Sequence, residues 1–236
     1  MLSYIQDTEY KVYDLNFIYQ ASLMIMFNDS IDLFSKKDEI LPVLKLAADK
    51  VETLENNEVE AYFKKYGMLY LTKHSVFVYI PGDKYVSIHN FDFCFSILDT
   101  IIRIVNSKSY GITVSKGNKF TILHDINNED EWDVFLSSIV SPSYLSASSK
   151  KDNNKRFYVL TQNDKFTVSA ESTWGKEKEG NGNSVFINLV GCLFNCEDNP
   201  KSLSNIVYSI DKDVYNVWHW TINADVLSAM EGGNRK

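Results

Sequence analysis

The first 67 residues place apolar side chains at helical spacing. Residues 14–28 form a broad apolar stripe behind Asp14, a residue type that is favoured as a helix cap. Pro42 is tolerated in a first helical turn, so a second helix is expected there. A third helix is expected over residues 57–67, where Glu60 completes a capping box and a glycine ends the run. The sequence therefore predicts a helical N-terminal segment.

From residue 68 onward the apolar side chains recur at every second position. This spacing is typical of strands, and it predicts a three-stranded meander over residues 68–72, 75–80 and 85–89. The period returns to that of a helix over residues 92–106. The apolar stripe of this helix consists of Cys94, Ile97, Leu98, Ile101, Ile102 and Val105. The region thus predicts a meander followed by an amphipathic helix, with Cys94 in the core.

A second hairpin and a further helix are expected before residue 140. Residues 110–115 and 119–124 alternate in polarity, and a glycine lies between them, so they predict two strands joined by a turn. A helix is expected to begin at Asn127 or Asn128, because three acidic residues follow and acidic side chains are favourable in a first turn.

Residues 141–155 differ in composition from both flanking regions. They are rich in Ser, Lys and Asn, which is typical of a linker or a mobile loop. This segment separates a mixed region, residues 1–140, from a strand-rich region, residues 156–230. One continuous domain is the alternative to this division.

Strand signals dominate beyond the predicted linker. Residues 156–161 and 165–170 predict a hairpin, and a flexible polar loop is expected at residues 175–184. Further strands are expected at residues 184–193, 205–210 and 214–222, and a short final helix at residues 223–230. Because helices and strands are interspersed rather than alternating as parallel units, the predicted fold class is α+β with antiparallel sheets.

Composition indicates a globular protein that needs no covalent support. Of the 236 residues, 44% are hydrophobic, and 14 Tyr, 14 Phe and 4 Trp supply large side chains for a core. No apolar run approaches the roughly 20 residues of a membrane helix, and the N-terminus lacks the basic start of a signal peptide. Three cysteines, an odd number, fit a reducing compartment. We therefore expect a cytoplasmic protein that does not contact membranes.

The net charge of −7 is concentrated at the start of the chain. Residues 1–60 hold 12 acidic and 5 basic side chains, whereas acidic and basic side chains balance in the remainder. Arginine, the side chain best suited to phosphates and bases, occurs only three times, which argues against nucleic-acid binding. The asymmetry predicts either a surface for a basic partner or a solvated face that keeps the protein soluble. The candidate contact residues are Asp29, Asp32, Asp38, Glu39, Glu52, Glu55 and Glu58.

The standard catalytic and cofactor motifs are absent from the sequence. It contains no HExxH, GxSxG, P-loop or GxGxxG pattern. Cys192 and Cys196, four apart on an expected strand, would lie about 13 Å apart, too far for a disulfide or a shared zinc ion. We therefore expect no cofactor, no metal site and no catalytic residue that a motif identifies. A site dispersed along the chain would draw on His124, Asp125, Glu171 and His219.

Trp218 and Trp220 flank His219 in an expected strand, where the two indoles would share one face. Such a face is either part of the core or an exposed binding platform. The sequence does not decide between these two roles.

The favoured function is non-catalytic binding of a protein partner, as by an inhibitor, an immunity protein or an adaptor. An acidic helical surface would attract a basic partner such as a nuclease or another toxin or effector. The first alternative is an enzyme, a hydrolase or a transferase with a dispersed active site. The second is a structural or assembly component of a phage or mobile element, since the Arg-poor, Lys- and Asn-rich composition fits an A+T-rich gene.

Overall fold

The structure is a computed structural model of the chain. It describes residues 18–85, 87–122, 130–131, 134, 138–139, 141, 156–163, 166–179, 182–193 and 202–226. Apart from Ser141, the predicted linker lies outside the described residues, as does the second half of the predicted final helix, residues 227–230.

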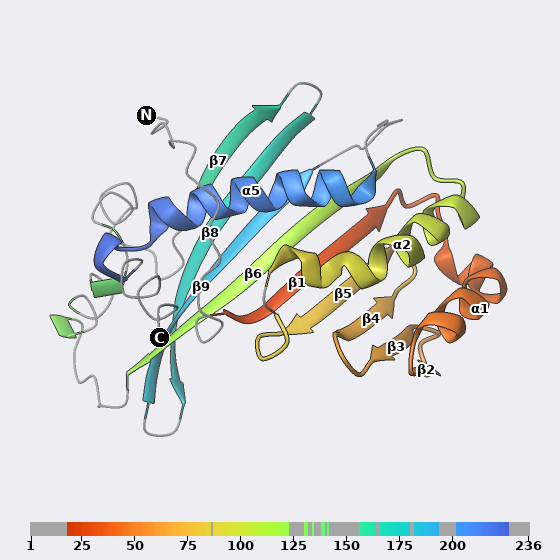
Figure 1. Ribbon diagram of the computed structural model, residues 1–236, viewed down its shortest axis with the longest axis horizontal. Coiled ribbons are helices and arrows are strands. Elements are labelled where there is room, and N and C mark those ends of the chain that lie inside the picture. Colours follow the sequence, from red (N-terminus) through yellow and green to blue (C-terminus); the bar gives the residue numbers. More distant parts are fainter. Residues whose placement is uncertain are drawn as a thin grey trace.

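The centre of the fold is one antiparallel sheet whose nine strands follow the order β2-β3-β4-β5-β1-β6-β9-β8-β7 (Figure 1). The strands are β1 (Ile18–Phe27), β2 (Lys50–Thr53), β3 (Val59–Phe63), β4 (Gly67–Leu71), β5 (Ser75–Pro81), β6 (Tyr110–Ile122), β7 (Arg156–Asn163), β8 (Phe166–Glu179) and β9 (Gly182–Leu193). Every neighbouring pair is antiparallel. Together with the helices, this sheet confirms the predicted α+β class.

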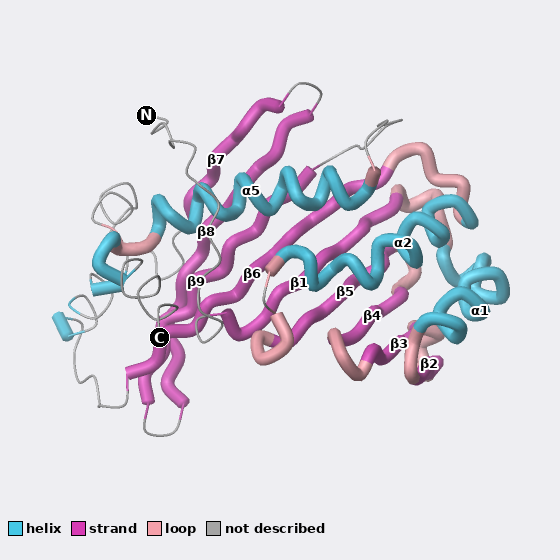
Figure 2. Tube along the Cα trace, in the orientation of Figure 1, coloured by secondary structure: helices cyan, strands magenta, loops and turns pink. Residues whose placement is uncertain are grey.

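Three α-helices lie on the same side of the sheet, as Figures 1 and 2 show. They are α1 (Lys37–Ala47), α2 (Asp92–Ile104) and α5 (Leu203–Thr221). Two short 3-10 helices, η2 (Leu33–Lys36) and η3 (Ile88–Phe91), lead directly into α1 and α2. Among the described residues, no helix is long and apolar enough to cross a membrane.

Alternation along the strands separates a buried face from an open face. In β1, Ala21, Leu23 and Ile25 are fully buried, whereas Met26 on the other face is 45% exposed. Leu23 lies opposite Val78 of β5 and Val114 of β6, so one apolar layer runs across several strands. The helices complete this core with Ile40, Leu44, Leu98, Ile101, Ile206 and Ile210.

The predicted helices over residues 14–28 and 57–67 are wrong where the structure describes them. Residues 18–27 form the strand β1, which is hydrogen-bonded to β5 on one side and β6 on the other. Residues 59–63 form β3. The second helix is confirmed in part as α1. It begins at Lys37, so Pro42 lies inside it rather than in its first turn, and the chain returns to a strand at Lys50. Pairing on both edges outweighs weak helical propensity in a central strand.

The next two segments agree with the sequence in part. The helix at residues 92–106 is confirmed as α2, and strands 68–72 and 75–80 as β4 and β5. The third strand of the meander, residues 85–89, is wrong, because Ser87 and Asn90 form a capping box that starts η3. The predicted hairpin at residues 110–124 is also wrong. Residues 110–122 form the single strand β6. The residues of the expected turn, such as Gly117, are paired with both β1 and β9.

The C-terminal prediction is correct for the β7–β8 hairpin and for β9, and it is wrong for the last two strands. The β7–β8 hairpin pairs Asn163 with Phe166, and strand 184–193 is β9. Where a loop was expected at residues 175–184, the end of β8 pairs with the start of β9. This pairing continues up to Glu179 opposite Gly182. Residues 205–210 and 214–221 belong to α5, which Ser202 caps.

Packing against the sheet explains why residues 203–221 are helical. Their buried positions recur at helical spacing and comprise Leu203, Ile206, Val207, Ile210, Val214, Val217 and Trp218. A Cβ added to Gly191 of β9 would lie 2.6 Å from side-chain atoms of Ile210 and Val214, so the helix packs closely on that glycine. Trp218 belongs to this buried set and is a core residue, whereas the Trp220 side chain lies outside what the structure describes.

The sheet joins strands from both sides of the predicted linker. β6 and β9 pair from Ile112 opposite Leu193 to Ile122 opposite Asn183. The division of the chain at residues 141–155 stays a prediction.

Candidate functional site

The seven acidic candidates lie at the end of the molecule formed by the β1–η2 turn, α1 and the β2–β3 hairpin, here called the acidic end. Asp29 lies in the turn after β1, and Asp32 caps η2 by accepting a hydrogen bond from the amide of Phe34 at 2.9 Å. Asp38 and Glu39 occupy the first turn of α1, where acidic side chains interact favourably with the helix dipole. Only these two of the seven lie in an α-helix.

The remaining three acidic residues belong to the β2–β3 hairpin. Glu52 lies in β2, and Glu55 and Glu58 lie in or beside the turn. Asn57 adopts a left-handed conformation there, with φ of 68°, which asparagine tolerates better than most residues. The expected acidic helical surface is therefore a surface of turn, helix and hairpin.

A hydrogen bond links the start of α1 to the turn of the β2–β3 hairpin. The Nζ atom of Lys37 donates a hydrogen bond to the carbonyl of Asn57 at 3.1 Å. Because Asp38 follows Lys37 and Glu58 follows Asn57, this contact places acidic residues of both elements in one neighbourhood. Asp29 and Asp32 adjoin them through the chain, because η2 continues into α1.

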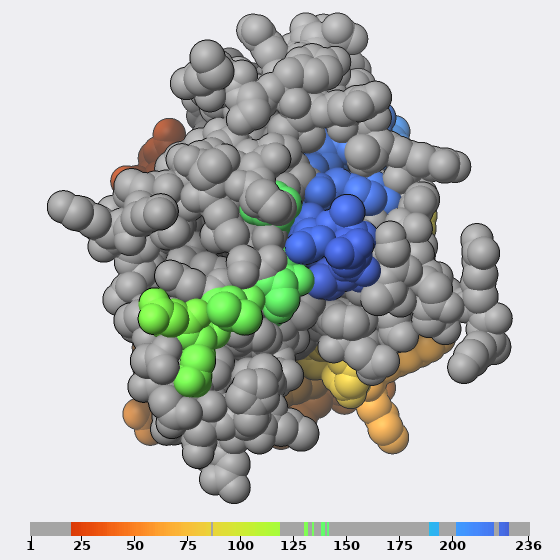
Figure 3. Space-filling model, turned by 90° about the vertical axis from the view of Figure 1, so that its left-hand side faces the viewer, coloured from red at the N-terminus to blue at the C-terminus, as the bar shows by residue number. Residues whose placement is uncertain are grey.

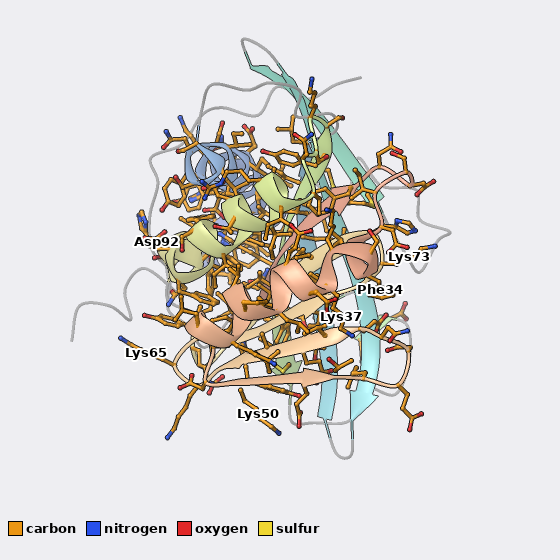
Figure 4. All side chains as sticks on the ribbon, turned by 90° about the vertical axis from the view of Figure 1, so that its right-hand side faces the viewer. Phe34, Lys37, Lys50, Lys65, Lys73 and Asp92 are labelled. Carbon is orange, nitrogen blue, oxygen red and sulfur yellow. The ribbon has the colours of Figure 1, made fainter. Side chains whose placement is uncertain are left out.

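Lysines are interspersed among these carboxylates. Lys36 pairs with Glu39 at 2.8 Å, and Lys50 pairs with Glu52 at 2.6 Å. Figure 4 shows this end of the molecule, with Lys37 on α1, Lys50 at the β2 edge, and Lys65 and Lys73 on opposite sides. Residues 29–60 nevertheless contain nine acidic and four basic side chains, so the surface stays negative.

The open face of the sheet begins at the same hairpin. Glu60 lies directly opposite Glu52, and the Tyr62 hydroxyl donates a hydrogen bond to Glu60. This bond, with smaller effects of burial and of Glu52, raises the pKa of Tyr62 to about 12. Lys50 lies over the Tyr62 ring at 5.7 Å, and so a cation offsets the two adjacent carboxylates.

Two leucines of the acidic end expose apolar surface. Leu46, near the end of α1, is 91% exposed, and Leu54 in the hairpin turn is 36% exposed. Apolar side chains of this kind can anchor a partner inside a charged rim.

A cavity of about 350 Å³ opens beside Asp29. It lies where the end of β1 pairs with the start of β6, and Met26 is opposite Gly111. Its lining consists of Met26, Phe27, Asn28, Asp29, Ser109, Tyr110 and Gly111. We call it the Asp29 hollow.

The fold also assembles an exposed polar cluster that the sequence analysis missed. The Tyr208 hydroxyl of α5 donates a hydrogen bond to Asp92, at the start of α2. His89 Nδ1 lies 3.2 Å from the same hydroxyl and 3.5 Å from the Asp92 carboxylate. Burial, with a contribution from Asp92, raises the pKa of Tyr208 to about 12. The separation of about 116 residues between Asp92 and Tyr208 hides this cluster from any local motif.

A buried charged pair joins α5 to the sheet. Lys116 Nζ of β6 lies 2.5 Å from a carboxylate oxygen of Asp211, whose side chain is fully buried. The same ammonium lies 5.6 Å from the centre of the Tyr85 ring. Burial, with a smaller effect of Asp211, raises the pKa of Tyr85 well above its usual value.

The other chemistry-bearing candidates do not converge in the described part of the chain. His219 contacts Tyr215 of the same helix, with 2.9 Å between Nε2 and the hydroxyl. His124, Asp125 and Cys196 lie outside the described residues, and the Glu171 side chain is not described. Within the described ranges, no three His, Cys, Asp or Glu side chains are placed to hold a metal ion.

Two cysteines have described surroundings. Cys94 is fully buried, as predicted, and its thiol donates a hydrogen bond to the carbonyl of Phe91 at 3.0 Å. Burial raises the pKa of this thiol. Cys192 forms no disulfide within the described residues, and its sulfur lies 3.4 Å from the hydroxyl of Thr113. Neither environment is that of an activated thiolate.

Comparison with known proteins identifies no relative. The chain matches no protein-family model, and no curated protein or solved structure resembles it closely enough to indicate a family. A functional argument therefore has to rest on the residues themselves.

Proposed function

We propose that the protein binds a basic protein partner through the acidic end, without catalysis. The observation that carries this proposal is the convergence of acidic residues from three elements, linked where Lys37 contacts Asn57. Charged groups at such a surface steer a partner of opposite charge and speed its association. The proposed class is that of an inhibitor, an immunity protein or an adaptor.

Exposed apolar surface supports the same proposal. Interfaces gain most of their affinity from a few buried anchors, while the charged rim sets association rate and orientation. Leu54 offers such an anchor beside Glu55 in the hairpin turn, and Leu46 offers a second one near the C-terminal end of α1. An acidic rim with apolar anchors fits a protein partner better than a small polar ligand.

The cluster of His89, Asp92 and Tyr208 is the strongest feature in favour of an enzyme, and its exposure weakens that alternative. The His89 side chain is 67% exposed and the Asp92 side chain 53%. Electrostatic catalysis depends on groups held in a site from which water is excluded. Two of the three side chains are thus mostly in contact with water, so a binding function is better supported.

The experiment compares two triple variants in affinity capture from the native host. One carries Asp38→Asn, Glu39→Gln and Glu55→Gln at the acidic end. The matched control carries Asp83→Asn, Asp130→Asn and Asp225→Asn, three exposed carboxylates outside the acidic end. Both variants change the net charge by the same amount.

We expect the acidic-end variant to associate with the captured partner at least tenfold more slowly than the wild type, because charge steering changes on-rates by about 10–10³-fold. The control should associate at close to the wild-type rate. Added salt should slow the wild type most, since exposed charges are screened within about 8 Å at physiological ionic strength. Equal association rates for both variants would contradict the proposal.

A further inference from the structure

The open face of the sheet, which no described α-helix covers, carries a continuous band of aromatic and thioether side chains (Figure 2). The band crosses four neighbouring strands, β3, β4, β5 and β1. Along each strand its members alternate with buried core residues, so all of them point to the open side. We call this set the aromatic band, and it consists of Tyr62, Met68, Tyr70, Phe77, Tyr79, Met24 and Met26.

Cross-strand pairing makes the aromatic band continuous. Tyr70 of β4 lies directly opposite Phe77 of β5, and Phe77 lies opposite Met24 of β1. The rings of Tyr70 and Phe77 are 6.3 Å apart in a tilted arrangement, and the Tyr70 hydroxyl lies 3.6 Å from the Met68 sulfur. Met26 is 45% exposed and the other members are half-buried, so each of them presents part of its surface to solvent.

One end of the aromatic band is acidic. Glu60 of β3 lies between Glu52 of β2 and Tyr70 of β4 in one cross-strand row. Two like charges directly opposite each other destabilise a sheet, so a cation beside them is favoured. The Lys50 ammonium pairs with Glu52 at 2.6 Å, whereas the Glu60 carboxylate accepts only the hydrogen bond of the Tyr62 hydroxyl among the described residues. The band therefore ends at a half-buried carboxylate that has no cationic partner in the described part of the chain.

We infer that the aromatic band receives an amphipathic helix of the basic partner. Lysine or arginine side chains of that helix lie at Glu60 and Glu52, and its apolar side chains lie over Phe77 and Met24. This inference rests on the proposed function and deepens it, because buried apolar contacts supply most of the affinity of an interface.

The backbone of the sheet favours a helix over an extended segment as the occupant. β3, β4, β5 and β1 are each paired on both edges, so a segment that lies on their face finds no backbone partners there. A helix satisfies its own backbone hydrogen bonds and buries an apolar stripe against a sheet, as α5 does at Gly191 on the opposite face.

The spacing of the strands sets the length of the bound helix. Neighbouring strands lie about 4.8 Å apart, so β3 and β1, which are separated by three such spacings, lie about 14 Å apart. A helix rises about 1.5 Å per residue, and about ten residues span this distance. Basic residues in one terminal turn, followed by apolar residues at helical spacing, therefore match the aromatic band.

The test uses capped peptides of about 14 alanine, leucine and lysine residues as probes. Leucines form one helical face, and lysines occupy the first turn in one peptide and the last turn in the other, so both directions of the helix are sampled. The matched controls carry glutamates in place of the lysines. The reporters are the methyl signals of Met24, Met26 and Met68 in methionine-labelled protein.

We expect the better of the two lysine peptides to shift these methyl signals in a saturable way. It should bind about tenfold more tightly than its glutamate control, because several exposed charge pairs change from attractive to repulsive. Equal affinities of the lysine and glutamate peptides, or methionine signals that no lysine peptide shifts, would overturn the inference.

Two substitutions locate the contact. Glu60→Lys should reverse the preference, so that the glutamate peptide becomes the tighter ligand. Phe77→Ala should weaken binding of the lysine peptide about tenfold, because it removes an apolar anchor. Asp225→Lys makes the same change of charge at an exposed site beyond α5 and should leave the preference intact. An unchanged preference in Glu60→Lys would overturn the inference, even if Phe77→Ala did not fold.

A second copy of the chain is the competing occupant of the aromatic band. Sedimentation of the protein without peptide distinguishes it, and we expect a monomer whose Met24 signal is independent of concentration. A dimer whose formation shifts the Met24 and Met26 signals would show that the band joins two copies, and would overturn the inference.

The outcomes separate this inference from the proposed function, since the acidic-end triple variant changes no residue of the aromatic band. If that variant slows partner association but no lysine peptide moves the methionine signals, the band is not a helix site and the binding function stands. If the lysine peptide binds as expected but both triple variants associate equally fast, the aromatic band stands and the acidic end is not the contact surface.

Discussion

At the scale of single residues, the pair of Lys116 and Asp211 is the most demanding feature of the core. An ionised group loses its hydration when it is buried, and only a close partner of opposite charge offsets that cost. The Asp211 side chain has no exposed surface, and it lies 2.5 Å from the lysine ammonium. The pair therefore ties α5 to β6 in one relative position.

Removing one partner of this pair should lower the free energy of unfolding more than removing both. We expect Asp211→Ala to lower the free energy of unfolding by about 3–5 kcal/mol, because it leaves a buried ammonium without its partner. The double variant Lys116→Met with Asp211→Leu should lose less, since apolar side chains of similar size fill the same space.

Urea unfolding of the wild type, of Lys116→Met and Asp211→Leu alone, and of the double variant gives the coupling free energy. Lys50→Met with Glu52→Leu, which removes an exposed pair, is the matched control and should change stability by less than about 1 kcal/mol. Additive losses at positions 116 and 211 would show that the buried pair is not coupled.

At the scale of elements, the β3–β4 hairpin shows how local signals can indicate the wrong structure. The sequence from Asn57 to Gly67 has a capping residue, a glutamate three positions later and a terminal glycine, as a helix would. In the fold, Gly67 instead begins β4 with φ of 157°. A Cβ there would lie 2.1 Å from the carbonyl oxygen of Tyr79.

The substitution Gly67→Ala distinguishes a glycine that ends a helix from one that begins a strand. After a helix, an alanine in place of the capping glycine costs about 1 kcal/mol. In the strand, a methyl group would overlap backbone that cannot rotate away, so we expect a loss of more than about 3 kcal/mol. Thermal or urea unfolding measures it.

Gly111→Ala is the control for this change, because that glycine also lies near the start of a strand, but a Cβ there would make only ordinary contacts, the nearest at 3.5 Å from the Leu193 carbonyl. It should be neutral or slightly stabilising. Similar losses for the two alanine variants would argue against the close approach of Gly67 to β5.

At the scale of the whole molecule, one sheet carries every described strand, and the described α-helices cover only one of its faces (Figure 2). At the end of α5, the amide of Asn223 donates a hydrogen bond to the carbonyl of Ile139 at 2.7 Å. Figure 3 shows this last part of the described chain, in blue, at the surface. The regions on either side of the predicted linker are thus connected by both β6–β9 pairing and this contact.

Limited digestion with trypsin should cut first at Lys150, Lys151 or Lys155 in the predicted linker. The two fragments should then stay together, because β6 and β9 remain paired along their length. Gel filtration under native conditions should give one species of unchanged size, and denaturing electrophoresis should give two bands.

A first cut inside α2 would contradict the linker prediction. Separation of the fragments after a cut in the linker would contradict the shared sheet. The lysines of the acidic end, such as Lys36 and Lys37, act as an internal control, since they precede and begin α1.

The sequence by itself determined the features that depend on neighbours along the chain. It predicted the α+β class, the amphipathic helix α2 with Cys94 in its core, strands β4, β5 and β9, and the β7–β8 hairpin. In each case the period of apolar residues and the adjacent turn residues agree, so local and tertiary preferences coincide.

Only the tertiary structure decided the rest. β1 is a strand because β5 and β6 satisfy its backbone on both edges, and α5 is a helix because its apolar stripe packs onto β9 at Gly191. The acidic candidates were identified from the sequence, but their convergence depends on the contact between Lys37 and Asn57. The Asp29 hollow is lined by Met26 of β1 and Gly111 of β6, which are paired in the sheet but lie 85 positions apart in the sequence. Interactions over such separations leave no periodic signal, because their energy is gained only once the sheet has assembled.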